Sequence, residues 1–508
     1  MGRKILFVTT DQQRYDALGC NGGTIARTPV ADRLAATGIN YRRAHNQNVV
    51  CMPARSTMIT GQYVRTHGVF ANGVPLPADA PSVAAWLHEK AGYRTALVGK
   101  AHFEPAIDPG FHWFENRMAR DGSVGPYRGF DHMELAMHGW SFGRYHYDKW
   151  LASNFPGEHR GFFRLMTREG LNHRGGGDTG APQVAVNPMP REHYHTDWVA
   201  ERTIAWLDSL PADADWFAWM SFPDPHHPWD PPAAETKRVR WRDLDLPPGH
   251  PGSHEKIVEI LRGKPQHWLD WYEGRFDNME GGPTQFVPCR MTHDQVREIN
   301  AMVHVENELI DEACGRVLAR IAERGWDADT DVFFTTDHGE LQGDFGLMFK
   351  GPYHVDALMR IPFIWRPAPS AGAVPAVIEE PVGQLDLAPT FCRIAGVPVP
   401  EWMQGVPLPT APGSDRERVI TEWDSQFTHI DMHLRSIYRD GLVCTAYERG
   451  RRYAGTEGEL YDLREDPLQW RNLWDDAGYR GLRSDLLADL YDHLPAAREP
   501  ALAVEAPA

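Results

Sequence analysis

Lys4-Ile5-Leu6-Phe7-Val8-Thr9-Thr10-Asp11-Gln12, near the start of the chain, is a short apolar run that ends at a carboxylate and an amide. Apolar runs of this length are typical of strands that are buried on both faces of a sheet. Similar runs that end in ionisable side chains recur at residues 93–102, 215–227 and 331–340. Because helical patterns lie between them, the sequence predicts an α/β fold with a large, mostly parallel sheet sandwiched by helices. Since ligands bind at the carboxyl ends of parallel strands, we expect a functional site there.

The spacing of apolar residues also predicts how the rest of the chain is organised. Helices are predicted at residues 30–37, 82–90, 196–210, 292–324 and 385–395. Two stretches without clear periodicity, about 104–195 and 230–290, are interpreted as irregular insertions near the site. We predict a catalytic domain over residues 1–396 and a smaller C-terminal α+β domain over 397–508, with an antiparallel sheet and a terminal helix. Its last residues, 496–508, are rich in Ala and Pro and form either a tail or an arm between subunits of a homo-oligomer.

Composition narrows the class of protein. The 508 residues are 42% hydrophobic and 24% charged, as in an ordinary globular protein, and the net charge of −17 argues against nucleic acid or an anionic membrane as partner. The first apolar run is too short for a signal peptide, and no stretch has the roughly 20 apolar residues that span a bilayer. Six cysteines without CxxC spacing indicate neither a disulfide framework nor a zinc site. We therefore expect a cytoplasmic location.

A thiol lies at the start of a predicted helix in Val49-Val50-Cys51-Met52-Pro53-Ala54-Arg55-Ser56-Thr57-Met58-Ile59-Thr60-Gly61. Pro53 suits the first helical position and Gly61 suits the end, which puts Cys51 just before the first turn. The helix dipole there favours an ionised nucleophile or an anionic substrate, and the guanidinium of Arg55 can reach both. The simpler interpretation of Cys51 is a small buried side chain. A thiolate nucleophile would call for a histidine in the motif, and the motif has none.

Two predicted strand ends supply ligands that suit a divalent cation. Asp11 and Asp337 offer carboxylates, His338 offers an imidazole, and Gln12 offers an amide oxygen beside the first carboxylate. Aspartates at strand ends also commonly cap the next helix, but convergence of several ligands favours a metal site. This ligand set favours Mn²⁺ or Mg²⁺ and leaves Ca²⁺ open.

Basic and titratable side chains at the same strand ends suit an anionic substrate. Lys100 and Lys350, together with Arg55, could neutralise a tetrahedral dianion. His102 and His226 are placed to move protons, one for the nucleophile and one for the leaving group. Three further residues are predicted to lie next to the site or to bind substrate: Asn72, His227 and His354.

The Cys-x-Pro-x-Arg motif followed by Thr60-Gly61 resembles the sulfatase family of the alkaline phosphatase superfamily. Further segments similar to sulfatase signatures follow in the family's order: Asp11-Gln12, residues 28–35, Gly99-Lys100-Ala101-His102, Pro225-His226-His227-Pro228, residues 336–340 and residues 459–467. Together they span nearly the whole chain, so the resemblance implies an alkaline phosphatase-like fold and a sulfuric ester hydrolase.

The resemblance implies that a separate maturase oxidises Cys51 to formylglycine (3-oxoalanine), whose hydrate attacks the sulfur of the ester. Such a nucleophile needs no thiolate partner. The resemblance further implies one divalent metal, Ca²⁺ or Mn²⁺ or alternatively Mg²⁺, held by Asp11, Gln12, Cys51 as formylglycine, Asp337 and His338.

The resemblance also implies a role for each remaining site residue. Arg55 would steady the diol, and Lys100 and Lys350 would bind the sulfate oxygens. His226 would protonate the leaving oxygen, and His102 would take the proton that regenerates the aldehyde.

Two departures from the family pattern leave the substrate open. Many sulfatases carry Asp where Gln12 stands and Asn where His338 stands, and the residues here are closer to relatives that hydrolyse phosphonate monoesters and phosphodiesters. The segment Gly99-Lys100-Ala101-His102 is nevertheless the sulfatase version. The leading hypothesis is a sulfatase of aryl or small organic sulfates. The alternatives are a phosphonate monoester or phosphodiester hydrolase, an enzyme with both activities, and a binding protein without turnover.

Overall fold

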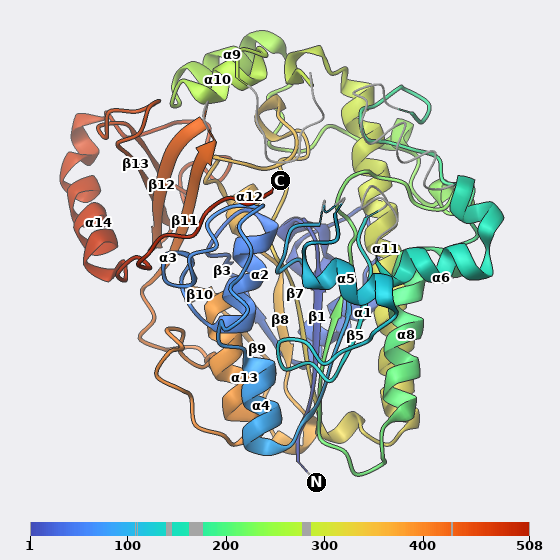
Figure 1. The fold of residues 1–508 in the computed structure, drawn as a ribbon. Helices are drawn as coiled ribbons and strands as arrows, with labels where there is room; N and C mark the ends of the chain where they lie inside the picture. Colours follow the sequence, from blue (N-terminus) through green and yellow to red (C-terminus); the bar gives the residue numbers. More distant parts are fainter. Residues whose placement is uncertain are drawn as a thin grey trace.

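The chain folds around one large sheet with a smaller sheet beside it (Figure 1). The computed structural model describes residues 2–106, 108, 110–138, 145–161, 176–276, 286–427 and 430–506. The large sheet has eight strands in the order β5-β4-β6-β1-β7-β8-β2-β9. Their bounds are β1 Lys4–Thr10, β2 Ile39–Tyr41, β4 Arg94–Gly99, β5 His132–Leu135, β6 Trp216–Ser221, β7 Thr330–Thr336, β8 Phe363–Arg366 and β9 Ala376–Ile378.

The register of the central strands brings their carboxyl ends to one level. Parallel pairing aligns Thr10 of β1 with Thr336 of β7, and Ser221 of β6 with both Thr9 and Gly99. The residues that follow these strands therefore emerge at one edge of the sheet, as the sequence predicts. The sequence does not predict β8, which runs antiparallel to both β7 and β2.

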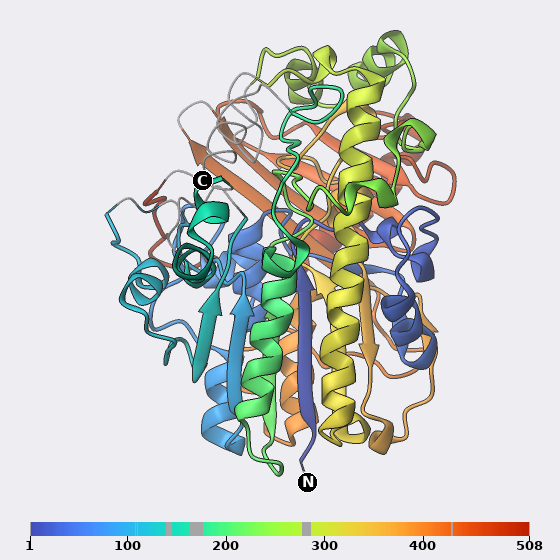
Figure 2. The same cartoon turned by 90° about the vertical axis from the view of Figure 1, so that its right-hand side faces the viewer.

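Helices cover both faces of the large sheet (Figures 1 and 2). On one face lie α1 Pro29–Thr37, α8 His195–Ser209 and α11 His293–Glu323, which pack through an apolar core that includes Leu34, Trp198 and Leu309. On the other lie α2 Cys51–Thr60, α4 Val83–Ala91 and α13 Leu387–Ala395. Every residue of α2 is buried, so this helix is held from all sides. The predicted fold class is confirmed.

The C-terminal part forms a separate antiparallel sheet, β11 Arg418–Phe427, β12 Ile430–Arg439, β13 Leu442–Glu448 and β14 Gly458–Asp462. Helix α14 Arg480–His493 covers it through Leu486 and Leu490. The short β-rich runs at residues 419–423, 433–438 and 442–447 predict the first three strands, and β14 was not predicted. The boundary at residue 396 stays a prediction. The remaining short elements are α3 Val64–His67, α12 Asp356–Met359, β3 Ala44–His45 and β10 Val382–Gly383.

The stretches predicted as irregular insertions contain more regular structure than expected. Residues 104–195 include α5 Phe114–Asp121, α6 His146–Asn154 and strand β5, which completes one edge of the large sheet. The polar and apolar residues of β5 do alternate, but over only four residues, which is too short a pattern to identify a strand in this stretch. Residues 230–290 include α9 His254–Arg262 and α10 His267–Tyr272. Parts of both stretches lie outside the described residues.

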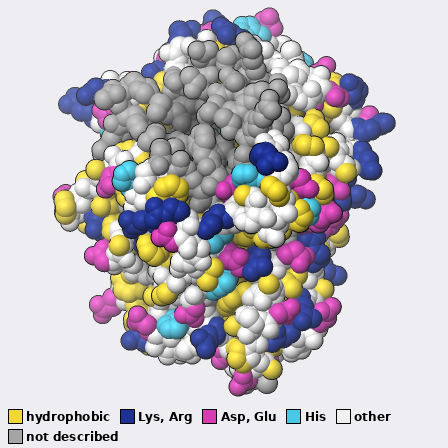
Figure 3. Space-filling model, turned by 45° about the vertical axis from the view of Figure 1, so that its right-hand side comes forward, with side chains coloured by type: hydrophobic (Ala, Val, Ile, Leu, Met, Phe, Trp, Pro, Cys, Tyr) yellow, Lys and Arg dark blue, Asp and Glu magenta, His cyan; other side chains and the backbone are white. Residues whose placement is uncertain are grey.

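The helices and one face of the surface can be compared with the features expected of membrane-spanning and strongly charged proteins. Within the described residues, none of the helices combines the length and apolar character that crossing a bilayer requires. On the face shown in Figure 3, acidic and basic side chains are interspersed over the described area rather than separated by sign.

Candidate active site

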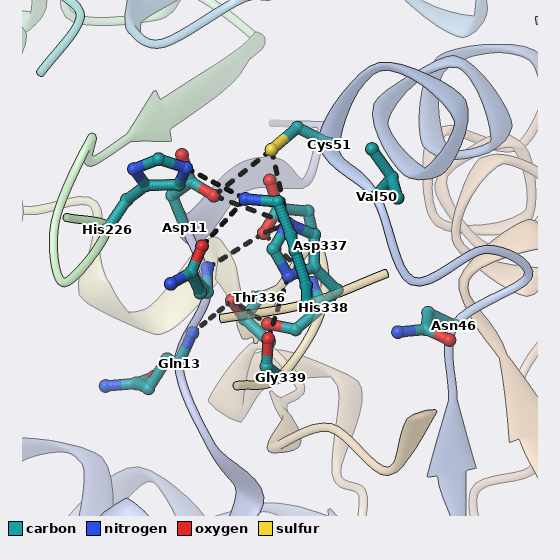
Figure 4. Close-up of polar contacts among 12 residues, drawn as sticks. Asp11, Gln13, Asn46, Val50, Cys51, His226, Thr336, Asp337, His338 and Gly339 are labelled. Atoms are coloured by element: carbon teal, nitrogen blue, oxygen red, sulfur yellow. Dashed lines mark hydrogen bonds and ion pairs between the residues drawn. The ribbon is translucent and has the colours of Figure 1, made fainter. Parts of the chain in front are cut away.

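Four ligand-bearing side chains converge at the carboxyl edge of the large sheet (Figure 4). Asp11 follows β1, Asp337 and His338 follow β7, and Cys51 starts α2; one ligand atom from each lies within 4.8 Å of all the others. The Cys51 Sγ is 3.2 Å from His338 Nε2 and 3.6 Å from Asp11 Oδ1. All four side chains are buried. A thiol and three potential metal ligands from distant parts of the sequence thus share one small volume.

The start of helix α2 differs from the prediction by two residues. Cys51 is itself the first helical residue, and Pro53 is the third rather than the first. Proline fits there because the N–H groups of the whole first turn lack partners within the helix. Val50 precedes the helix and has no polar side chain that could cap it. Asn72, which lies outside the helix, caps it instead: its Oδ1 accepts a hydrogen bond from the Met52 N–H at 3.0 Å. The structure thus gives Asn72 a capping contact, and its predicted substrate contact stays a prediction.

Three buried cations surround the four ligands. Lys100 Nζ forms an ion pair with Asp11 Oδ2, and Arg55 Nε donates to Asp337 Oδ2 at 2.8 Å. Arg55 also donates to the Lys100 carbonyl and to Ser221 Oγ, each at 2.8 Å. Lys350 Nζ lies 2.7 Å from Gln12 Oε1. Because the cations outnumber the two carboxylates, the site suits an additional anion.

The cations set the protonation of the site. Burial alone would raise the pKa of the Asp11 carboxyl, but Lys100, Arg55 and Lys350 hold that pKa well below its usual range. Burial raises the pKa of the Cys51 thiol to about 11, and Asp11 adds to the effect. Burial lowers the pKa of His338, although Asp337 acts in the opposite direction. The site therefore combines an ionised carboxylate, a neutral imidazole and an un-ionised thiol.

This ligand set fits a divalent cation. His338 Nδ1 lies 2.9 Å from the Gly339 carbonyl, so Nδ1 carries the proton and the lone pair of Nε2 faces the other ligands. Two carboxylates and one imidazole suit Mn²⁺, Mg²⁺ or Ca²⁺ better than soft metals. Gln12 donates its backbone N–H to Asp337 Oδ1 at 3.0 Å, while its side-chain oxygen accepts from Lys350. The ligand role of the Gln12 side chain stays a prediction.

The sequence family accounts for this arrangement. A family model described as "Sulfatase" matches residues 3–397, and a second, "N-sulphoglucosamine sulphohydrolase, C-terminal", matches residues 343–495. The chain belongs to the sulfatase family. The predicted resemblance is thereby confirmed, and with it a hydrolase that acts on sulfuric esters.

Individual relatives match the sulfatase chain over nearly its whole length. It is 27% identical to an uncharacterized sulfatase, YidJ, of Escherichia coli (strain K12), covering 97% of this chain and 88% of the relative. It is 26% identical to an arylsulfatase of Clostridium perfringens (strain 13 / Type A), covering 94% and 92%. Its fold is similar to that of a phosphonate monoester hydrolase of Agrobacterium radiobacter, with a TM-score of 0.75, 23% identity and coverage of 96% and 95%.

Three histidines of this sulfatase stack beside the buried cations Lys100, Arg55 and Lys350. The ring of His226 lies 4.1 Å from that of His138 and 4.0 Å from that of His227. His226 Nε2 is 2.9 Å from Lys350 Nζ, and burial followed by Lys350 keeps the pKa of His226 well below its usual range. The sequence did not point to His138. It follows β5, and the short run Leu135-Ala136-Met137 ending at a histidine could have indicated it.

The other two histidines predicted for the site differ in position. Burial and then Lys100 and Arg55 lower the pKa of His102, so its half-buried side chain lies within electrostatic range of these two cations. Within the described residues its Nδ1 has no hydrogen-bond partner. His354 instead contacts Ser436 Oγ of β12 at 2.6 Å, against the C-terminal sheet.

A second group of buried acids lies directly behind the site, and the sequence did not point to it. Asp224 accepts from the hydroxyls of Tyr194, at 3.2 Å, and Thr196, while Glu306 Oε1 accepts from the Asp230 N–H at 3.1 Å. Burial raises the pKa of Asp224 to about 7, and burial also raises the pKa values of Asp230 and Glu306 well above their usual range. We call Asp224, Asp230 and Glu306 the buried acid group. Near neutral pH Asp230 and Glu306 hold their protons, and Asp224 is partly protonated.

Proposed function

We propose that the chain hydrolyses aryl or small organic sulfate esters, with residue 51 converted from cysteine to formylglycine and one divalent cation bound by Asp11, Asp337, His338 and residue 51. The observation that carries this proposal is the position of the Cys51 side chain among potential metal ligands. A formylglycine-generating maturase is then a required partner. The predicted cytoplasmic location and homo-oligomeric state stay predictions.

The surroundings of Cys51 support an oxygen nucleophile over a thiolate. His338 lies 3.2 Å from the sulfur and could resemble the base of a Cys–His pair. Yet burial raises the pKa of the thiol to about 11, and Asp11 and Asp337 act in the same direction. A thiolate nucleophile needs the opposite shift. A diol oxygen at this position needs no such ionisation to lie beside a hard cation.

The cations and histidines around residue 51 have complementary tasks in this proposal. Lys100, Lys350 and Arg55 bind the oxygens of the ester and oppose the negative charge that grows in the transition state. His226 Nε2 shares a proton with the Lys350 ammonium, and this pair supplies it to the leaving oxygen. His102 accepts the proton that regenerates the aldehyde. A bound divalent cation supplies Lewis-acid polarisation of an ester oxygen.

A second candidate is hydrolysis of phosphonate monoesters or phosphodiesters by the same residues. Gln12 and His338 favour it, because these positions depart from the common sulfatase residues towards those of the phosphonate-cleaving relatives. A phosphonate monoester and a sulfate monoester carry the same single negative charge at neutral pH, so the three cations suit either. An enzyme with both activities is compatible with this site.

Side-by-side kinetics test the proposal. The enzyme is produced together with the maturase and loaded with Mn²⁺, and kcat/KM is measured for 4-nitrophenyl sulfate and for a 4-nitrophenyl phosphonate monoester. We expect measurable turnover of both and a higher kcat/KM for the sulfate. A negligible rate on the sulfate beside a clear rate on the phosphonate would reverse the order of the two candidates.

A variant of residue 51 tests the nucleophile. Cys51→Ser, made in a host whose maturase oxidises only cysteine, should fold and bind Mn²⁺ but lose most turnover, by about 10³-fold or more. Near-normal activity of this variant would rule out the formylglycine assignment.

A further inference from the structure

The last described residues cross back from the C-terminal domain to the main domain. Helix α14 ends at His493, and the Arg498 N–H donates to the Arg65 carbonyl of α3 at 2.7 Å. The N–H groups of Glu505 and Ala506 both donate to the Gly73 carbonyl, at 2.8 and 3.3 Å. In Figure 1 the dark red segment after α14 runs past α3 towards the end of α2 that lies at the carboxyl edge of the sheet. We call residues 495–506 the strap.

The strap packs closely on residues 65–73, which we call its seat. Half-buried Leu502 and Val504 pack on the main apolar core, while Ala501 and Ala503 between and before them are exposed, as in an extended strand on a surface. Two glycines of the seat have positive φ, Gly68 at 82° and Gly73 at 86°. A Cβ on Gly68 would lie 2.6 Å from the Arg498 side chain, and a Cβ on Gly73 would lie 2.2 Å from the Ala506 carbonyl. The glycines therefore admit the strap at close range.

The seat also contacts the helix that carries Cys51. The Gly73 N–H lies 3.2 Å from Met52 Sδ, and Asn72 Oδ1 accepts from the Met52 N–H. Gly73 thus contacts the strap through its carbonyl and α2 through its N–H. Because Val50 cannot cap α2, the first turn of this helix depends on Asn72. The position of Asn72 depends in turn on the 68–73 turn that the strap covers.

We infer that the strap is a positioning element of the active site, which holds the 68–73 turn and through it the first turn of α2 and residue 51. Its effect on turnover rests on the proposed function. A displacement of about 1 Å at a reacting group can reduce a rate about 100-fold, so fixing this turn matters for catalysis. The strap acts on α2 through Gly73 and Asn72, which its residues 505 and 506 reach by their hydrogen bonds to the Gly73 carbonyl.

Two substitutions in the strap test whether its packing against the main domain affects turnover. Val504→Asp places a charge on the half-buried side, and Ala503→Asp places the same charge on the exposed side. We expect kcat for the aryl sulfate to fall about tenfold in Val504→Asp and to change less than about twofold in Ala503→Asp, with smaller changes in KM. Equal effects of the two substitutions would contradict the inference. A chain that lacks residues 498–508 should show the same decrease in kcat as Val504→Asp. Addition of a synthetic peptide of those residues should restore its kcat.

A measurement on the thiol separates failure of the inference from failure of the proposed function. In protein made without the maturase, Cys51 keeps its thiol, which is 1% exposed. We expect iodoacetamide to alkylate Cys51 at least about tenfold faster in Val504→Asp than in Ala503→Asp, as followed by peptide mass spectrometry. Hydrogen exchange at residues 68–73 should accelerate in parallel. If alkylation and exchange are the same in both variants, the strap does not position α2, whatever the enzyme hydrolyses.

Discussion

Two groups of buried carboxyls, one in the active site and one behind it, differ in what surrounds them. Asp11 and Asp337 each pair with a cation, Lys100 and Arg55 respectively. The buried acid group of Asp224, Asp230 and Glu306 is bonded instead to neutral partners such as Thr196 and the Asn187 amide. The groups are adjacent, because the Asp11 N–H donates to the Asp224 carbonyl at 3.0 Å.

The comparison teaches that burial alone does not decide the charge of a carboxyl. Both groups lose water to a similar extent, yet the pKa of Asp11 falls because of Lys100, while the pKa of Asp224 rises to about 7. Ionised carboxylates can bind a metal, whereas protonated ones can only donate or accept hydrogen bonds. The first group therefore suits chemistry, and the second fixes the Pro225–Pro228 loop that carries His226.

The largest effect is expected where a cation-paired carboxylate is neutralised. Asp337→Asn leaves Arg55 buried without its partner and removes a potential metal ligand, so we expect a loss of about 3–5 kcal/mol of stability and no detectable Mn²⁺ binding. Denaturant unfolding and titration calorimetry measure the two. Asp331→Asn, at the other end of β7, is the control, and Mn²⁺ affinity should survive there. Equal Mn²⁺ affinity of Asp337→Asn and wild type would contradict the assignment.

A smaller effect is expected where a cation is removed and both carboxylates remain. Lys350→Met should lower kcat about 10²- to 10³-fold, because one charge that opposes the transition-state anion is lost. After burial, Lys350 is the main cause of the low pKa of His226, so the limb of the rate profile that reports the protonation of His226 should move to higher pH. Kinetics against pH measure both, and the exposed Lys237→Met is the control. An unshifted limb would show that His226 does not titrate with Lys350.

The buried acid group predicts a pH dependence of stability. The pKa of Asp224 is near 7 in the folded state and about 3.8 in the unfolded chain, so the unfolded chain releases this proton at lower pH. The free energy of unfolding should therefore decrease as pH rises from about 4 to 7. Asp224→Asn should remove part of this slope, on the order of a few kcal/mol across the window. Urea unfolding from pH 4.5 to 7.5 measures it, with the exposed Asp79→Asn as control. A variant with the wild-type slope would show that Asp224 is ionised in the folded protein.

The smallest effect is expected at the neutral cap of α2. Asn72→Ala removes the acceptor for the Met52 N–H and should cost about 1 kcal/mol, with a larger decrease in kcat than increase in KM. Ser82→Ala removes the cap of α4 and serves as control, since it should cost similar stability without loss of activity. A rise in KM alone for Asn72→Ala would favour the predicted substrate contact instead.

Much of the fold follows from local pattern. The strands that deliver Asp11, Lys100, His226 and Asp337 are continuous apolar runs, and the long helices have clear periodicity, so both were predictable. Strands β5, β8 and β9 were not, because short strands at or near a sheet edge take their stability from neighbours distant in sequence.

The site was predictable only where residues follow a recognisable strand or motif. His138 was not predicted because β5 was not recognised as a strand. The buried acid group was not predicted because its members come from two separate segments, α11 and the loop after β6. The contact of His338 with Cys51, 287 residues apart, is likewise a product of tertiary structure. The sequence alone suggested a thiol without a histidine; the structure gives it one and raises the pKa of the thiol nonetheless.

The chemical state of residue 51 in active enzyme tests the central claim most directly. Protein produced with the maturase is digested, and the mass of the peptide that contains residue 51 is measured alongside turnover of the aryl sulfate. The account predicts a peptide in which an aldehyde replaces the thiol of Cys51, in proportion to the specific activity of each preparation. Full activity in a preparation whose residue 51 is entirely unmodified cysteine would contradict it.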